Sequence, residues 1–283
     1  MKKHNLYYEE ITPKRQFFDV NLKEIWDYKD LLFLFVKRDF ISIYKQTILG
    51  PLWFFIQPIL TTIIFTIVFG KIAGISTDGI PQILFYLAGI TCWNYFSECL
   101  NKTSNTFIEN QNIFGKVYFP RIIIPISIVA SSLIKFKIQF LLFLLVFFYY
   151  LFSENTHINP NLYIFLFPIL LLTTSLLSLG VGLIITSLTT KYRDFRFLIQ
   201  FGVQLWMYAT PIIYPLSTLD GKLKTMAILN PMTSIIETFK FGFLGQGTFN
   251  WYYLLYTFII TFLLLFLGIR IFNKTEQNFM DTV

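Results

Sequence analysis

Long apolar blocks constrain this chain more than any other feature of its sequence. A helix needs about 20 mainly apolar residues to cross the hydrocarbon core of a membrane. Only 14% of the residues are charged, whereas soluble domains carry about a quarter. We therefore expect an all-α integral membrane protein with six spans within residues 51–272. The blocks are Leu52–Phe69, Ile80–Ser97, Ile122–Phe152, Leu162–Leu188, Phe197–Tyr214 and Trp251–Phe272.

Basic residues predict how these spans are oriented. Lys and Arg are enriched in the short loops on the cytoplasmic side of a membrane. They are dense before Pro51, in Lys102–Arg121 and in Lys191–Arg196, whereas residues 153–161, between the third and fourth spans, include none. This alternation fits a multi-pass protein with both termini in the cytoplasm.

The chain is expected to form one transmembrane domain, residues 1–283. A cytoplasmic N-terminal segment, residues 1–50, precedes the core, and a cytoplasmic tail, residues 273–283, follows it. The first fifty residues are polar and charged, so we expect no cleaved signal peptide. Within them, Leu22–Gln46 has apolar residues at helical spacing, which predicts an amphipathic helix along the membrane surface. A packed helix of a small soluble domain would show a similar pattern.

The third span is longer than a membrane requires. As a helix, Ile122–Phe152 would extend about 46 Å, against a hydrocarbon core of about 30 Å. It also contains two lysines, Lys135 and Lys137. Their long side chains can reach the membrane interface, or they can line a polar pathway through the protein. The sequence leaves both interpretations open.

The region from Pro211 to Asn250 combines apolar residues with helix-breaking ones. Two half-apolar pieces, Ile212–Leu219 and Met226–Leu244, are interrupted by proline and glycine, and neither is suited to cross a bilayer. Irregular backbone at membrane depth must be buried in protein or face a watery cavity. We therefore expect a re-entrant pair of short helices on the outer side, with a plain external loop as the alternative.

Motifs for catalysis and for energy coupling are missing from the sequence. It has no G-x-x-x-x-G-K-[ST] phosphate loop, and no ligand cluster surrounds His4 or His157, so we expect no metal site and no cofactor. Glu98 and Glu237 are the only acids near membrane depth, fewer than an ion-coupled transporter normally has. We expect no catalytic residues, and a transport subunit driven by a partner. The net charge of +7 reflects the loop pattern rather than a nucleic-acid partner.

Five groups of short stretches stand out in order along the chain: Tyr44–Trp53 with Gln57–Pro58, Lys116–Arg121, Lys191–Arg196, Thr210–Pro215 with Asn230–Pro231, and Thr275–Glu276 with Phe279 and Asp281. In order and spacing they resemble the type-2 ABC exporter permeases for polysaccharide, over nearly the whole chain. The nearest subtype in this resemblance is the O-antigen (Wzm-type) permease subunit, and capsule and teichoic acid exporters are related to it. The tail departs from the family pattern at Asn273–Lys274, where paired basic residues are common.

The resemblance implies a homodimer in the bacterial inner membrane, surrounded by membrane lipids and working with two copies of a separate ATP-binding cassette subunit. ATP would be hydrolysed on that subunit, so this chain would not be an enzyme. The substrate would be a long glycan on undecaprenyl diphosphate, as in lipopolysaccharide biosynthesis. Two alternatives remain, a membrane enzyme of glycan assembly and an ion-coupled flippase. The first would need catalytic residues in large outer loops, and the second more membrane acids.

Two kinds of candidate site accompany the resemblance. A short helix, Glu109–Lys116, is expected to enter a groove of the ATP-binding subunit with Ile113 and Phe114 as apolar anchors, and a solvated loop is the alternative. Cationic groups near the inner leaflet would bind the diphosphate of the carrier. The coupling candidates are Glu109, Ile113, Phe114, Lys116, Tyr192, Arg193 and Asp194, and the diphosphate candidates are Arg38, Lys45 and Lys135.

Bulky rings in the outer region are candidates for a gate. A pore wide enough for a glycan must close when idle, and apolar constrictions exclude water. The rings of two copies related by a twofold axis could close it, or they could simply anchor the region in the outer interface. Aromatic residues, 19% of the chain, also stack on sugar faces and populate interface belts. The gate candidates are Tyr214, Phe239, Phe241 and Phe243.

Overall fold

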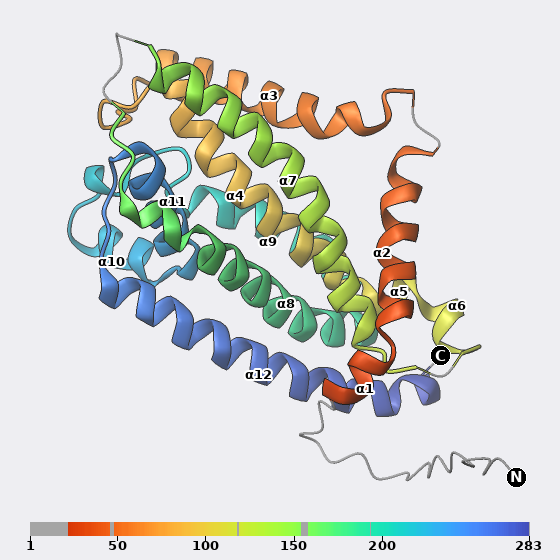
Figure 1. Cartoon of the computed structure of the whole chain (residues 1–283). Coiled ribbons are helices and arrows are strands. Elements are labelled where there is room, and N and C mark those ends of the chain that lie inside the picture. Colours follow the sequence, from red (N-terminus) through yellow and green to blue (C-terminus); the bar gives the residue numbers. More distant parts are fainter. Residues whose placement is uncertain (1–21, 46–47, 118, 154–157, 193, 283) are drawn as a thin grey trace, which may run out of the picture.

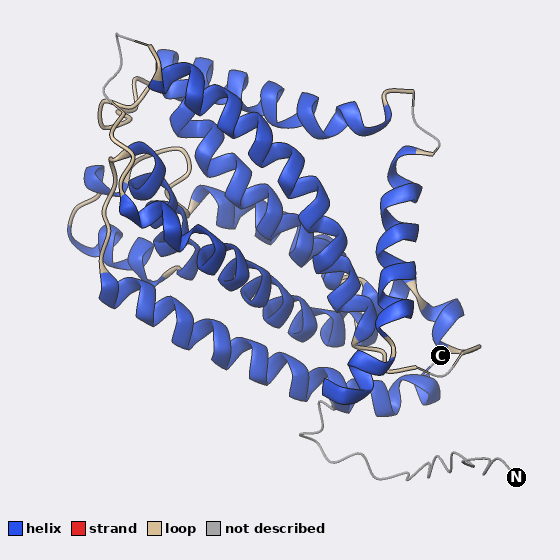
Figure 2. Ribbon diagram, in the orientation of Figure 1, coloured by secondary structure: helices blue, strands red, loops and turns tan. Residues whose placement is uncertain are grey.

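The computed structural model describes residues 22–45, 48–117, 119–153, 158–192 and 194–282. Within them every regular element is a helix, which confirms the all-α class (Figure 2). The α-helices are α1 (Leu22–Asp27), α2 (Lys29–Tyr44), α3 (Trp53–Phe65), α4 (Gln82–Thr103), α5 (Thr106–Glu109), α6 (Gln111–Phe114), α7 (Ile123–Leu151), α8 (Phe167–Lys191), α9 (Phe195–Tyr208), α10 (Gly221–Leu229), α11 (Pro231–Leu244) and α12 (Trp251–Thr282). Four shorter elements are η1 (Gly50–Leu52), η2 (Thr66–Ile72, a π-helix continuing α3), η3 (Leu162–Leu166, leading into α8) and η4 (Leu216–Thr218).

Four helical stretches are long and apolar enough to cross a membrane. They are Gly50–Ile72, Ile123–Leu151, Leu162–Lys191 and Trp251–Gln277. Each coincides with a block expected to span, so the membrane-spanning character of the chain is supported at these four places.

The expected second and fifth spans correspond to α4 and α9. The structure supports a membrane crossing less strongly for these two helices than for the other four. α4 is about 33 Å long, enough to cross, but Glu98 and Lys102 lie near its end. α9 has 14 residues and extends about 21 Å, less than the hydrocarbon core of about 30 Å. The count of six spans therefore stays a prediction that depends on these two helices.

α4 is the central helix of the bundle. It packs against α3, α7 and α8, and also contacts α9 and α11. Its residues from Leu84 to Trp93 are all buried, and the Trp206 ring of α9 packs on the Trp93 ring with the ring centres 6.3 Å apart. The other long helices are arranged around α4 (Figure 1).

α8 and α12 form the most extensive helix pair, and small residues allow it. A Cβ atom added to Gly180 would lie only 2.7 Å from the backbone nitrogen of Leu265. The same helix approaches α4 at Gly182, where an added Cβ would lie 2.7 Å from the Thr103 side chain. Close backbone approach at small residues is a common way for membrane helices to associate.

The ends of the helices gather on two opposite sides of the bundle (Figure 1). α1, α5, α6, the start of α7 and the end of α12 lie together, and α10, α11 and the start of α12 lie at the other end. This grouping agrees with the expected topology, which places the loop after the second span and the tail on one side. The tail is not a separate segment, because α12 continues through residues 273–282.

The surface helix expected at Leu22–Gln46 is divided into two helices, α1 and α2, with a break at Tyr28, and Gln46 lies outside the described residues. α2 packs against α7 and runs across the direction of the long helices (Figure 1). Phe35 is buried, while Trp26, Phe33 and Leu34 are exposed. A helix that lies crosswise and exposes large apolar side chains suits a membrane interface.

The outer region folds differently from the expected pair of helices. Ile212–Leu219 is mostly irregular and contains only η4, and Met226–Leu244 is split between α10 and α11 at Asn230. The Asn230 side chain caps α11 by accepting from the Met232 amide at 3.1 Å, and it also accepts from the Trp206 indole at 3.0 Å. Pro231 follows at the first helical position, where its missing N–H is no loss.

Irregular backbone at 210–215 is held inside the protein, between α4 and α11. Ile212 is fully buried, and a Cβ atom on Gly89 of α4 would touch it at 3.0 Å. Lys240 of α11 donates to the Pro211 carbonyl at 2.8 Å, and its ammonium lies 3.5 Å from the centre of the Phe85 ring. The segment is thus buried in protein, as irregular backbone at membrane depth requires.

Three of the four gate candidates belong to the packing of the chain itself. Phe239 and Phe243 are buried, and their rings lie 5.2 and 5.5 Å from that of Phe143 on α7. The Phe241 ring points to another side of α11, where its centre lies 5.3 Å from that of the Tyr163 ring. Because the rings of Phe239 and Phe243 face the interior of a single copy, they do not line an opening in this conformation. Phe241 and Tyr214 are both half-buried.

Replacing Phe239 by alanine should therefore destabilise the fold rather than open a leak. The loss of a buried ring predicts a decrease of about 3–5 kcal/mol in the free energy of unfolding. Denaturant unfolding of the purified protein measures this, with Phe262→Ala on the exposed side of α12 as the matched control. If the variant kept its stability and let more dye through the liposome membrane than the wild type, the result would support the gate hypothesis instead.

The grouping of helix ends predicts a labelling pattern. In a background with Cys92→Ala and Cys99→Ala, a cysteine at the exposed position Lys222 of α10 should react with an impermeant thiol reagent in intact cells. A cysteine at the exposed position Asn112 of α6 should react only after the inner face is opened. Reaction at position 112 in intact cells would contradict the topology.

Candidate functional site

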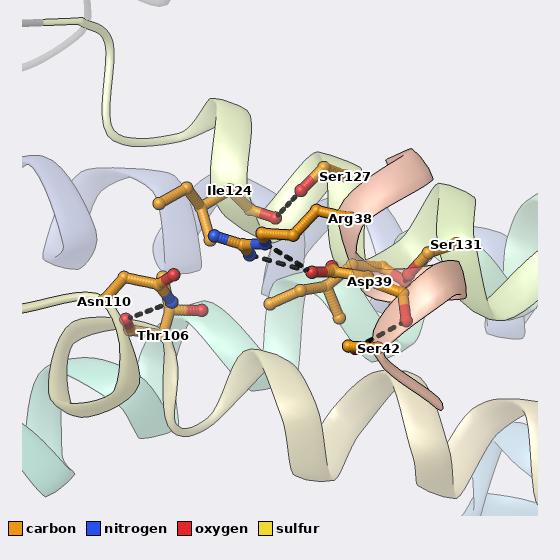
Figure 3. A network of polar contacts seen from close by, with 9 residues as sticks. Arg38, Asp39, Ser42, Thr106, Asn110, Ile124, Ser127 and Ser131 are labelled. Carbon is orange, nitrogen blue, oxygen red and sulfur yellow. Dashed lines mark hydrogen bonds and ion pairs between the residues drawn. The ribbon is translucent and has the colours of Figure 1, made fainter. Parts of the chain in front are cut away.

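The segment between α4 and α7 forms two helical turns instead of the single expected helix Glu109–Lys116. α5 ends at Glu109 and α6 begins at Gln111, with Asn110 between them. The amide of the Asn110 side chain donates to the Thr106 carbonyl at 3.0 Å, beside the bond at 3.2 Å from the Asn110 backbone N–H to the same oxygen (Figure 3). Side chains of Asn bind nearby backbone in this way and so favour breaks between helices.

The expected apolar anchors differ in their surroundings. Phe114 is only 4% exposed, and its ring lies 5.8 Å from Phe107 and 5.9 Å from Phe119. It is therefore a core residue of this chain and is not presented to a partner. Ile113 is half-buried, and Lys116 and Val117 are exposed. A partner at this segment would meet Val117 first among the apolar side chains.

The second candidate segment follows α8. Tyr192 is exposed, and its ring lies 5.8 Å from Phe195, while the Lys191 ammonium lies 5.2 Å above it. Asp194 is exposed at the start of α9. Arg193 lies outside the described residues. The side chains at this turn are thus open to a partner on the same side as α5 and α6.

The structure brings the two segments together. A guanidinium nitrogen of Arg196 lies 3.7 Å from a carboxylate oxygen of Glu109. The Thr189 hydroxyl at the end of α8 donates to the Ser104 carbonyl at 2.8 Å. Segments more than eighty positions apart in the sequence therefore form one surface.

Glu109 lies where several charges meet. Burial raises the pKa of its carboxyl group above the ordinary value, and nearby Asp39 adds to this rise. Arg196 and Lys102 act in the opposite direction. The Glu109 carboxyl group thus interacts electrostatically with cations on two helices, α4 and α9, and with an acid on α2.

The end of α12 completes this surface. A guanidinium N–H of Arg121 donates to the Glu276 carbonyl at 2.9 Å, and the Phe107 and Phe272 rings stack with their centres 4.7 Å apart. We call α5, α6, the start of α9 and the end of α12 the coupling face. Arg121, Arg196 and Glu276 were not among the site residues inferred from the sequence, although all three lie in the stretches that carry the family resemblance.

The three diphosphate candidates have separate surroundings. Arg38 on α2 pairs with Asp39 at 2.8 Å, close to the start of α7 (Figure 3). Lys45 is exposed at the end of α2. Lys135 on α7 pairs with Glu98 of α4 at 2.7 Å. Two of the three cations therefore already have an acidic partner within the chain.

Metal ligands do not gather anywhere in the part of the chain that the structure describes. No group of three or more His, Cys, Asp or Glu side chains there is arranged to hold a metal ion.

Comparison with known proteins adds the family. The chain is 25% identical over 264 residues to the O-antigen export system permease protein RfbA of Myxococcus xanthus, covering 93% of this chain and 98% of that protein. It is 27% identical to the RfbA protein of Klebsiella pneumoniae, over 89% of this chain and 94% of that one. The polysialic acid transport protein KpsM of Escherichia coli is 24% identical, over 83% of this chain and 89% of that protein.

A family model described as "ABC-2 type transporter" matches residues 30–244. The match begins in α2 and ends at the last residue of α11. It includes α4, the outer region and the parts of the coupling face that α5, α6 and α9 supply, whereas the end of α12 lies outside it. Since the model matches well over half of the sequence, the chain belongs to the ABC-2 type transporter family.

Proposed function

We propose that this chain is the membrane-spanning subunit of an ATP-driven exporter of lipid-linked polysaccharide. The observation that carries the proposal is its similarity, along nearly the whole length of both chains, to permeases named for O-antigen export. The relatives include a polysialic acid transport protein and a capsule polysaccharide export protein, so a glycan substrate is the common element.

The proposed working unit has two copies of this chain and two copies of a separate ATP-binding subunit. It sits in the bacterial inner membrane with both termini in the cytoplasm. The glycan travels outward on undecaprenyl diphosphate, as the family resemblance implies. The chain itself contributes the path and no chemical step.

Energy would enter through the coupling face. The ATP-binding subunits are soluble and cytoplasmic, and the coupling face lies at the end of the bundle where positive loops predict the cytoplasm. A push on α5 and α6 would reach α8 through the Thr189–Ser104 hydrogen bond, and α9 through the ion pair of Arg196 with Glu109. It would reach α12 through the bond of Arg121 to Glu276. These contacts connect one docking point to three helices.

Loss of export in the living cell tests the proposed function. Deleting the gene should remove a polysaccharide from the cell surface and leave it inside on its lipid carrier, and the wild-type gene should restore it. The purified complex with its ATP-binding subunit should hydrolyse ATP faster when the lipid-linked glycan is added. Normal surface polysaccharide in the deletion strain would refute the proposal.

Charge reversal tests the coupling face. Arg196→Glu should place two acids together at Glu109 and lower glycan-stimulated ATP hydrolysis severalfold, while the double change with Glu109→Arg should recover part of it. Stability should change little, since an exposed ion pair contributes about 0–1 kcal/mol. Lys222→Glu, at the opposite end of the bundle, is the control. Equal stimulation in all variants would show that this ion pair does not transmit the signal.

A further inference from the structure

A strip of polar side chains runs along the inner half of α4. Asn94, Ser97, Glu98, Asn101 and Lys102 recur at intervals of three and four residues, so they share one face of the helix. All five are partly exposed, whereas the remaining α4 residues from Leu84 to Thr103 are buried. Lys135 and Gln139 of α7 lie beside this face. We call these seven residues the polar strip.

The charges of the polar strip do not balance. The two oxygens of Glu98 are each engaged, one by Lys102 at 2.8 Å and the other by Lys135 at 2.7 Å. The side chains of Glu98, Lys135 and Lys102 are 15%, 20% and 36% exposed. One carboxylate faces two ammonium groups, which leaves an excess positive charge. Each ammonium has three donors, so the contact with Glu98 does not exhaust them.

The ion pair between Lys135 and Glu98 fixes the direction in which the Lys135 side chain points. A lysine that only reached for the membrane interface would extend away from its neighbours. Here the Lys135 ammonium is fixed to α4 and lies 5.6 Å from the centre of the Phe54 ring of α3. Three helices therefore position this cation. Lys137, two residues further along α7, is exposed.

Other polar atoms of the strip lack partners. Gln139 is 1% exposed, and its oxygen accepts from the Asn94 amide at 3.4 Å, but its own amide nitrogen has no hydrogen-bond partner among the described residues. The side-chain oxygen of Asn101 is also without a partner there. A buried polar group left unpaired is costly in an apolar environment. The strip therefore retains polar atoms that no described protein group satisfies.

Lipid cannot be what covers the strip. Charged side chains at membrane depth face the interior of a bundle or a water-filled cavity. From Lys102, next to the coupling face, the strip reaches Asn94, about 12 Å further along the helix. Beyond Asn94, the residues from Leu84 to Trp93 are buried. The polar side chains of the strip are suited to contact water or a polar ligand that arrives from the end of the bundle where the coupling face lies.

We infer that the polar strip is the inner entrance of the transport path and that its excess positive charge, on Lys102 and Lys135, binds the diphosphate of the lipid carrier. This inference rests on the proposed function. Glu98 holds both ammonium groups, one on each carboxylate oxygen, so the two cations lie close to each other. Lys135 is then a binding residue, Glu98 a positioning residue, and Arg38 and Lys45 are not required.

Binding of undecaprenyl diphosphate to the purified protein in detergent tests the assignment, with uncharged undecaprenol as the comparison. Lys135→Gln should weaken diphosphate binding about tenfold, the effect of losing one charge-assisted hydrogen bond, and leave undecaprenol binding unchanged. Lys137→Gln is the matched control and should change neither. Equal binding in the two variants, or an equal loss for undecaprenol, would overturn the inference.

Two further measurements keep the test decisive. If Lys135→Gln does not fold, Lys102→Gln, at a more exposed position, should weaken diphosphate binding in the same way. In the background with Cys92→Ala and Cys99→Ala, Ser97→Cys should react with a charged thiol reagent from the inner side, and Leu141→Cys on another face of α7 should not. No reaction at position 97 would show a dry strip. Because these assays use neither ATP nor export, they can fail while the export phenotype stands, and the reverse.

Discussion

The need to satisfy every backbone N–H and C=O group away from water governs this structure. In a bilayer no water replaces a missing partner, so a single chain meets the requirement with helices. This explains why long helices dominate and why the irregular segment at 210–215 is enclosed between α4 and α11. It also explains the buried lysine of that region, because the Lys240 ammonium supplies a donor to the Pro211 carbonyl that no helix could supply.

The burial of α4 among α3, α7, α8, α9 and α11 organises the rest of the bundle. Its outer half is surrounded by apolar side chains from several helices, while one face of its inner half carries polar groups. A central helix with this division separates a sealed outer half from a wettable inner half. The coupling face adjoins the wettable end, so the site where a partner would act and the site where a charged lipid head would enter belong to one continuous surface.

Features that depend on a local sequence pattern could be predicted from the sequence. The burial of individual side chains could not, because it depends on contacts with other segments. Each of the six apolar blocks coincides with a helix, and four of these helices are long and apolar enough to cross a membrane. Phe114 looked like an exposed anchor because nothing local shows that Phe107 and Phe119 surround it. The rings of α11 looked like a gate for the same reason. The pairing of Glu98 with Lys135 joins two helices, and no spacing rule in one chain predicts it.

The close approach of α8 and α12 at Gly180 has a mechanical consequence. Two helices whose backbones touch cannot slide or rotate past each other without a collision, so together with α4 they behave as a stiff frame. α9 is different, since Val203 is its one buried residue and most of its large side chains are exposed. The molecule is therefore unevenly stiff, and α9 can be displaced at a small loss of buried contacts, against the frame of α4, α8 and α12.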